Sequence, residues 1–256
     1  MENERRVQQK TPAGRYALLD ELRGLDLVSM MLYHACWDMM FLFGIWMDWY
    51  IGWPGRLWQQ SICWVFILLS GFCVPLGHRT LKRGAQVFAA GALVTVVTLV
   101  FMPEDRVVFG VLTFLGSAML LTGVLEPLLK KVMPAVGLAV SAVLFAVCYP
   151  VGLGWVGLGG WKLMLPQSLY ANYFTAFLGF YPDWFYSADY FGLLPWLFLF
   201  WAGYYLHKAV GRRRMEPLRR PVCPALGWMG RHSLLLYLLH QPVIYGVLSA
   251  AAVLFA

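Results

Sequence analysis

Long apolar blocks alternate with short polar segments along almost the whole chain. Most blocks are long enough to cross the hydrocarbon core of a bilayer, which takes ~20 residues of α-helix. Proline and glycine interrupt most of the gaps between them. We therefore predict an all-α polytopic membrane helix bundle of about seven transmembrane helices, at residues 23–47, 57–77, 84–101, 107–129, 133–152, 189–208 and 226–254.

Two segments fall outside this pattern. Residues 1–20 are polar and are predicted to form a cytoplasmic tail, and residues 21–256 a single transmembrane domain. Residues 153–188 are rich in Gly, Trp and Tyr but hold prolines and Asp183, which disfavour a regular spanning helix. We predict an extracytoplasmic cap here, with short helical or re-entrant pieces. Such irregular backbone is tolerated at membrane depth only where protein or a water-filled cavity covers it.

Charge placement sets the orientation and supports the helix count. With seven helices, the opposite side of the membrane holds only Arg56, Arg106 and Lys162. Positive residues mark the cytoplasmic side, so the N-terminus is predicted inside and the C-terminus outside. The remaining basic residues of the connections all fall on the cytoplasmic side: Arg5, Arg6, Lys10, Arg15, Arg79, Lys82, Arg83, Lys130, Lys131, Lys208, Arg212, Arg213, Arg214, Arg219 and Arg220.

Composition supports a membrane protein and excludes other classes. Hydrophobic residues make up 60% of the 256 positions and charged residues 13%, against about 25% charged residues in a soluble domain. The net charge of +7 lies in topology-setting loops, so we predict no nucleic-acid partner. The five cysteines show no metal-ligand spacing, and we expect neither a disulfide framework nor a metal.

The first block carries ionisable residues that are costly in lipid and therefore point inward. Asp26, His34 and Asp38 lie on one helical face at steps of four or eight residues. A carboxylate one turn from a histidine can orient the ring for general base catalysis. A structural His–Asp pair that locks two helices together is the alternative.

The last block carries a second polar face that includes Ser233, Tyr237 and His240. At ~1.5 Å rise per residue, His240 lies about as far from Arg231 as His34 lies from Arg23, and both arginines should sit near the cytoplasmic interface. We therefore predict that the two histidines share one depth and line one cavity. The alternative is that His240 and Gln241 satisfy backbone carbonyls freed by Pro242.

Two weaker signals lie elsewhere. The aromatic-rich stretch YPDWFYSADYFGLLPW (181–196) offers Ser187, Asp189 and Trp196 for binding a sugar or amine. An N-cap role for Ser187 or Asp189 explains the same residues equally well. Ser70 lies toward the end of the second block, where small residues favour close helix packing. The membrane topology already explains the basic loops on the cytoplasmic side. Contact with an anionic ligand such as a CoA is the second explanation.

Five stretches together resemble one known family. RGLDLVSMMLYHACWD (23–38), FILLSG (66–71), FGVLTFLG (109–116), SADYFGLLPW (187–196) and GRHSLLLYLLHQPV (230–243) are similar to the heparan-alpha-glucosaminide N-acetyltransferase catalytic-domain family, in its short bacterial branch. The Arg-x10-His spacing of Arg23 and His34 also resembles the wider superfamily of transmembrane acyltransferases. Thr113 departs from the family pattern, where a histidine is expected, and the chain is shorter than the larger relatives.

The resemblance implies acyl transfer in a bacterial inner membrane, from cytoplasmic acetyl-CoA to an extracytoplasmic amino sugar or other glycan. It maps the catalytic histidine to His34. We predict catalytic roles for His34, Asp38 and His240. Donor binding is assigned to Arg23, Asp26, Ser70, Arg231, Ser233 and Gln241, and acceptor binding to Ser187, Asp189, Trp196 and Tyr237. A homodimer is a further candidate assembly. The rival hypothesis is a proton-coupled transporter or lipid-handling membrane protein that uses the same buried polar residues.

Overall fold

The computed structural model describes residues 15–255, apart from the side chains of Arg212 and Phe255. The described chain is predominantly helical, and its contacts group it into two compact units. The first unit comprises the described residues up to Phe66 together with those from Val210 onward, and the second runs from Ile67 to Ala209. Most of the predicted tail, including Arg5, Arg6 and Lys10, lies outside the described residues.

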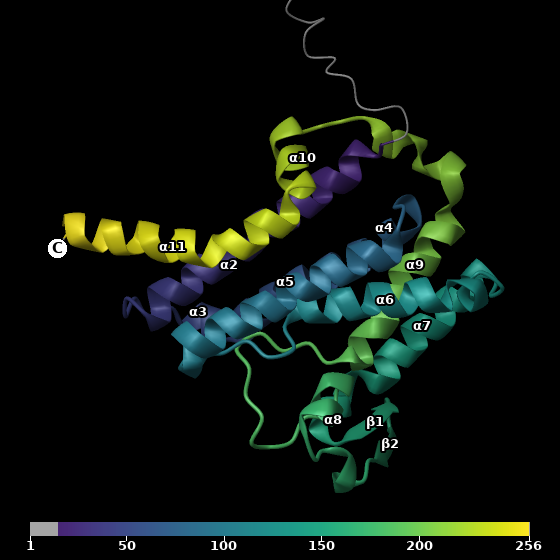
Figure 1. Ribbon diagram of the computed structural model, residues 1–256, viewed down its shortest axis with the longest axis horizontal. Helices are drawn as coiled ribbons and strands as arrows, with labels where there is room; N and C mark the ends of the chain where they lie inside the picture. The colour runs from purple at the N-terminus through teal and green to yellow at the C-terminus, as the bar shows by residue number, and fades with distance from the viewer. Residues whose placement is uncertain (1–14, 256) are drawn as a thin grey trace, which may run out of the picture. The chain divides into compact units, whose positions relative to one another are not determined.

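The first unit brings the beginning and the end of the chain together. In Figure 1, α2 (purple) lies beside α10 and the first turns of α11 (yellow). Leu27 and Met30 of α2 form a buried apolar cluster with Ile62 of α4, against which Leu236 and Tyr237 of α11 pack. The elements of this unit are α2 (Ala17–Phe41), α3 (Asp48–Ile51), the first part of α4 (Trp53–Cys73), the end of α9 (Leu193–Met215), η5 (Glu216–Arg219), α10 (Pro224–Arg231) and α11 (Ser233–Phe255).

Glycines allow α2 and α10 to cross at backbone contact. A Cβ atom on Gly24 would lie 2.0 Å from the carbonyl oxygen of Leu226. A Cβ atom on Gly230 would similarly lie 1.8 Å from the carbonyl oxygen of Asp20. Small residues at such crossings are the usual device by which helices approach closely in membranes. Glu21 adds a polar contact, because both of its carboxylate oxygens accept a hydrogen bond from the backbone N–H of Val222, at 2.9 and 3.0 Å.

Three predicted boundaries of this unit are wrong. Helix α2 begins at Ala17 and ends at Phe41, so the helix includes Asp20 and Glu21, which lie before the predicted first block 23–47. Both carboxylates are buried against α10 and its approach, which explains why the polar start of the helix is ordered. The predicted block 226–254 is two helices, α10 and α11, separated at His232, whose backbone N–H bonds back to the carbonyls of Trp228 and Met229.

The second unit is built around α6 (Val111–Leu129). Nine successive residues from Val111 to Met119 are buried, as expected for a helix that is surrounded by other elements. Helix α5 packs on it closely, because Gly116 lies against the backbone of Phe88 and Gly91 against that of Thr113. Thr113, where the family pattern has histidine, is therefore a tight packing position. The unit also contains η1 (Val74–Leu76), α5 (Thr80–Phe101), η2 (Pro103–Asp105), α7 (Pro134–Cys148), η3 (Tyr149–Leu153) and most of α9.

The segment 153–188 holds short helices, as predicted, together with a β-hairpin that was not. Strands β1 (Trp155–Leu158) and β2 (Trp161–Met164) pair antiparallel across Gly159 and Gly160. The 3-10 turn η4 (Gln167–Leu169) and α8 (Tyr173–Leu178) follow, and α8 starts at a capping box made by Asn172 and Thr175. None of these pieces has the length of a membrane-spanning helix.

Five helices within residues 15–255 are long and apolar enough to cross a membrane. Helices α2 and α9 are not among them, since α2 carries four charged residues in its first half and α9 is rich in Trp, Tyr and basic residues. The membrane class is thus confirmed, whereas the count of seven and the orientation of the termini stay predictions. The five are Trp53–Leu76, Thr80–Phe101, Val111–Leu129, Pro134–Leu153 and Ser233–Leu254.

Candidate active site

The two predicted histidines meet in the first unit. The ring of His34 on α2 and the ring of His240 on α11 have centroids 4.8 Å apart, at an interplanar angle of 61°. This contact confirms the prediction that the two side chains lie at one depth, which came from counting helical rise from Arg23 and Arg231. His240 is buried and His34 is half-buried. The two imidazole rings are therefore in contact inside the first unit.

The hydrogen bonding of His240 fixes which ring nitrogen carries the proton. Its Nδ1 lies 2.5 Å from the backbone carbonyl oxygen of Tyr237, and a carbonyl can only accept. Nδ1 is therefore the donor, and neutral His240 presents a lone pair at Nε2. That atom is buried and has no hydrogen-bond partner among residues 15–255. An oriented imidazole with a lone pair facing away from its backbone anchor is the form that a general base requires.

This bond also tests the alternative that His240 compensates for Pro242. A proline frees the carbonyl four residues before it, which here belongs to Leu238. His240 instead bonds the carbonyl of Tyr237, and Gln241 bonds a side chain of another helix. The proline therefore does not explain where these two side chains point.

Asp38 and Gln241 form a hydrogen bond across the same two helices. Gln241 Nε2 donates to Asp38 Oδ1 at 2.5 Å, and Asp38 is completely buried. The sequence analysis expected Asp38 to meet His34 one turn away. In the structure, Asp38 Oδ1 is hydrogen-bonded to Gln241 instead. Asp38 Oδ2 and Gln241 Oε1 have no partner within residues 15–255. Together with His240 Nε2, they make three buried acceptor atoms that have no hydrogen-bond donor within residues 15–255.

A cluster of aromatic side chains that the sequence analysis did not single out reaches His34 through Tyr33. Tyr33 contacts His34 edge-on and packs on Tyr50 and Trp58. Tyr50 donates to the backbone carbonyl of Tyr33 at 3.1 Å, and Trp58 Nε1 donates to Ser29 at 2.8 Å. The concentration of Trp and Tyr in residues 49–58 was the available signal, although most of it lay in the segment between the predicted helices 23–47 and 57–77.

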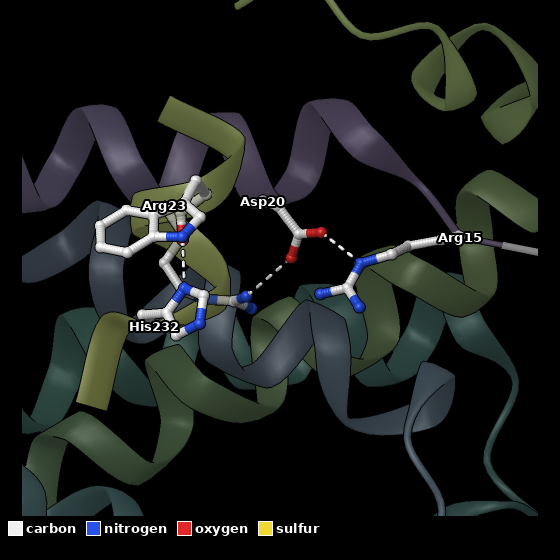
Figure 2. A network of polar contacts seen from close by, with 5 residues as sticks. Arg15, Asp20, Arg23 and His232 are labelled. Carbon is white, nitrogen blue, oxygen red and sulfur yellow. Dashed lines mark hydrogen bonds and ion pairs between the residues drawn. The ribbon is translucent and has the colours of Figure 1, made fainter. Parts of the chain in front are cut away.

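A separate polar network lies near the N-terminal end of α2. Figure 2 shows Asp20 between two arginines, with Arg15 Nε at 2.5 Å and Arg23 Nη1 at 3.4 Å from its carboxylate oxygens. The hydrogen bond to Asp20 raises the pKa of the Arg15 guanidinium above its ordinary value. Also in view, His232 Nδ1 donates to the carbonyl of Trp228 at 2.9 Å. Arg23 is therefore already paired, and its role in donor binding stays a prediction.

The other predicted donor-binding residues lie in varied surroundings. Asp26 is buried on α2, Ser233 is the first residue of α11, and Arg231 is exposed at the end of α10. Ser70 is half-buried near the end of α4, in the second unit. Their roles in binding a donor stay predictions.

Ser187 and Asp189 make structural contacts in the second unit. Asp189 Oδ2 accepts a hydrogen bond from the backbone N–H of Val111 at 3.0 Å, at the first turn of α6. Ser187 Oγ accepts from the backbone N–H of Val108 at 2.9 Å and donates to the carbonyl of Asp189. These bonds favour the capping explanation. The sequence could not specify which helix is capped, because that helix begins 78 positions earlier in the chain.

The remaining aromatic candidates are packed against other rings. Trp196 on α9 contacts Phe145, Tyr149 and Phe191 in the second unit. Tyr237 on α11 stacks on Phe66 and contacts His240 in the first unit. The structure thus brings Tyr237 to the histidine pair, while Trp196 belongs to an aromatic cluster of its own unit. Acceptor binding by either residue stays a prediction.

Substitution of Asp189 separates capping from substrate binding. Asp189→Ala should lower the free energy of unfolding by about 0.5–2 kcal/mol, because an amide at the start of α6 loses its acceptor. Asp189→Asn keeps an oxygen acceptor and should retain most of that stability. The measurement is thermal unfolding of the detergent-solubilised protein. A stable Asn variant with impaired acceptor affinity would instead show that the charge itself serves the substrate.

Comparison with protein families matches residues 15–242 to heparan-alpha-glucosaminide N-acetyltransferase, catalytic. The match covers most of the chain and includes both histidines of the pair. The chain belongs to this family. As a heparan-alpha-glucosaminide N-acetyltransferase catalytic-domain protein with apolar spanning helices, it is an integral membrane protein of transferase type. Neither the curated proteins nor the solved structures gave a match.

Membership of the N-acetyltransferase family agrees with the chemistry at the histidine pair. N-acetyl transfer removes a proton from an amine, and the pair offers a neutral base in a buried setting. No group of three or more His, Cys, Asp or Glu residues suited to a metal ion occurs within residues 15–255.

Proposed function

We propose that this protein is a membrane-bound acetyltransferase that moves an acetyl group from cytoplasmic acetyl-CoA to an extracytoplasmic amino sugar or other glycan acceptor. The observation that carries the proposal is the contact between the rings of His34 and His240, in a chain of an N-acetyltransferase family. The bacterial inner membrane as the location and the cytoplasmic side for the donor are what the family resemblance implies, and the charge asymmetry of the loops supports a cytoplasmic N-terminus.

The reaction needs one proton to be taken up and later returned. An acceptor amine attacks the thioester carbonyl, the new N–C bond forms, and the C–S bond breaks with release of the CoA thiolate. His34 removes the proton from the attacking amine, and the lone pair on His240 Nε2 stabilises the charged imidazole beside it. The same proton then passes to the thiolate, so that the products are the acetylated acceptor and CoA with a free thiol.

The hydrogen-bonding capacity of the site suggests which substrate it holds. Asp38 Oδ2, Gln241 Oε1 and His240 Nε2 are acceptors without a partner, and one of the two N–H groups of Gln241 Nε2 already bonds Asp38. An amine or a sugar hydroxyl supplies donors that these atoms lack, while a thioester carbonyl supplies only another acceptor. We therefore assign Gln241 and Asp38 to the acceptor substrate, which moves Gln241 away from the donor-binding role expected of it.

A proton-coupled carrier is the second candidate, and the same buried polar residues favour it. His34, His240 and Asp38 lie on two facing helices, as the members of a proton relay often do. The two functions differ in what they require: a carrier moves protons in the absence of acetyl-CoA, and an acetyltransferase does not. Proton flux into liposomes, measured without acetyl-CoA, distinguishes them.

A label-transfer assay tests the enzyme directly. The purified protein is given acetyl-CoA with a radiolabelled acetyl group and a panel of amino sugars. His34→Ala should reduce the transfer by about 10²–10⁴-fold, as expected for loss of a general base. His78→Gln changes an exposed histidine of the second unit and serves as the matched control. Absence of acetyl-CoA binding by calorimetry in the folded wild type would overturn the proposal.

A further inference from the structure

The two faces of the β-hairpin of residues 155–164 differ in charge, because Lys162 lies on one of them and the other holds only apolar side chains. The register of the hairpin pairs Trp155 with Met164, Gly157 with Lys162, and Leu158 with Trp161. Because side chains alternate between the faces of a strand, Lys162 shares one face with Trp155, and its Nζ lies 4.5 Å from the centroid of that ring. The opposite face is formed by Val156, Leu158, Trp161 and Leu163, and is called the apolar hairpin face here.

The apolar hairpin face is exposed in the folded chain. Leu158, Trp161 and Leu163 have 58%, 57% and 53% of their surface accessible. These side chains belong to a small sheet with fixed register, so their exposure is a property of the folded hairpin and not of an irregular loop. A contiguous exposed apolar surface of this kind marks a contact with a partner or a membrane.

The position of the hairpin identifies what covers this face. The candidate span Pro134–Leu153 ends two residues before β1 begins, so the hairpin starts where the chain leaves the hydrocarbon core. The side chains are also of the type found there, because Trp is enriched at membrane–water interfaces and Lys extends from them toward the headgroups.

The scarcity of charged residues around the hairpin also indicates contact with lipid. Lys162 is the only charged residue between Lys131 and Asp183. A water-facing protein surface carries about a quarter charged residues, and a segment that is almost uncharged and has exposed Leu and Trp is suited to a lipid surface. The single charge lies on the face opposite to the apolar one, where it can reach water or lipid phosphate.

We propose that the hairpin docks on the bilayer, with the apolar hairpin face in the interfacial region and Lys162 directed away from the acyl chains. Docking on lipid fixes the segment that connects α7 to α8 at the membrane surface. The inference concerns the bilayer alone and is independent of the enzymatic proposal.

Adjacent residues on opposite faces provide a matched pair for the test. A fluorescent amino acid is placed at Leu163 in one variant and at Lys162 in another, so that the native cysteines stay in place. Each variant is reconstituted in phosphatidylcholine vesicles that contain a nitroxide-labelled phosphatidylcholine. Val143, exposed on the spanning helix α7, is the lipid-facing reference, and the exposed Glu104 is the water-facing one.

Nitroxide quenching should be several-fold stronger at Leu163 than at Lys162, and close to that at Val143. A repeat at Leu158 and at Met164, which is exposed on the face of Lys162, should show the same alternation and protects the result against a variant that fails to fold. Equal and weak quenching at Leu163 and Lys162, with both accessible to aqueous iodide, would overturn the proposal. Protection of Leu163 from both quenchers would also overturn it, because a protein surface would then cover the face.

Discussion

Replacing His240 with alanine should reduce acetyl transfer by about 10²–10⁴-fold. The expectation rests on the orientation of the ring: Nδ1–H is committed to the carbonyl of Tyr237, and the lone pair on Nε2 is buried beside His34. Loss of the ring removes the group that stabilises the charged His34 during proton transfer. The readout is kcat for transfer of a labelled acetyl group to an amino sugar.

A conservative variant shows whether the ring or the volume matters. His240→Gln occupies a similar space and can still donate to the carbonyl of Tyr237, but it offers no basic nitrogen. It should therefore be nearly as inactive as the alanine variant, with thermal unfolding closer to wild type. Full activity of His240→Gln would contradict a role for the Nε2 lone pair and leave His240 as a packing residue.

Replacing Gly24 with alanine should destabilise the protein by about 1–3 kcal/mol, the usual cost of overpacking a close contact. A methyl group there would lie 2.0 Å from the carbonyl oxygen of Leu226, which no side-chain rotation relieves. Helices α2 and α10 must then separate, and the buried Asp20 and Glu21 lose part of their cover. The measurement is the midpoint of thermal unfolding in detergent.

Gly246 supplies the matched control for this prediction. It is also a helical glycine, but a Cβ atom added to it meets no heavy atom within 4 Å. Gly246→Ala should therefore be neutral or slightly stabilising, because alanine favours the helix by roughly 1 kcal/mol over glycine. Equal unfolding midpoints for the two variants would contradict the close crossing of α2 and α10.

The sequence predicted well those features that depend on helical periodicity. The apolar blocks located the main helices, and the rise per residue placed His34 and His240 at one depth although they lie far apart in the chain, on α2 and α11. Such predictions succeed because helical geometry is fixed by the backbone. The ends of the helices were predicted less accurately than their positions. The start of α2, for example, depends on burial of Asp20 and Glu21 by a segment that is distant in the sequence.

Pairing between distant side chains could not be predicted in this way. Spacing of four residues indicates that His34 and Asp38 can meet, but the structure gives Asp38 a partner 203 positions later in Gln241. The same reason applies to Asp189, whose capped helix begins 78 positions earlier. The β-hairpin was missed because its strands are only four residues long and carry apolar side chains on both faces.

The bond between Asp38 and Gln241 has a consequence for how the protein is made. Gln241 lies 203 positions after Asp38 in the chain, so the amide that receives the carboxylate is synthesised long after it. A carboxylate that is buried without its partner is costly. Asp38 can therefore take up its buried position only after this part of α11 has been made, and closure of the first unit around it is a late step of folding.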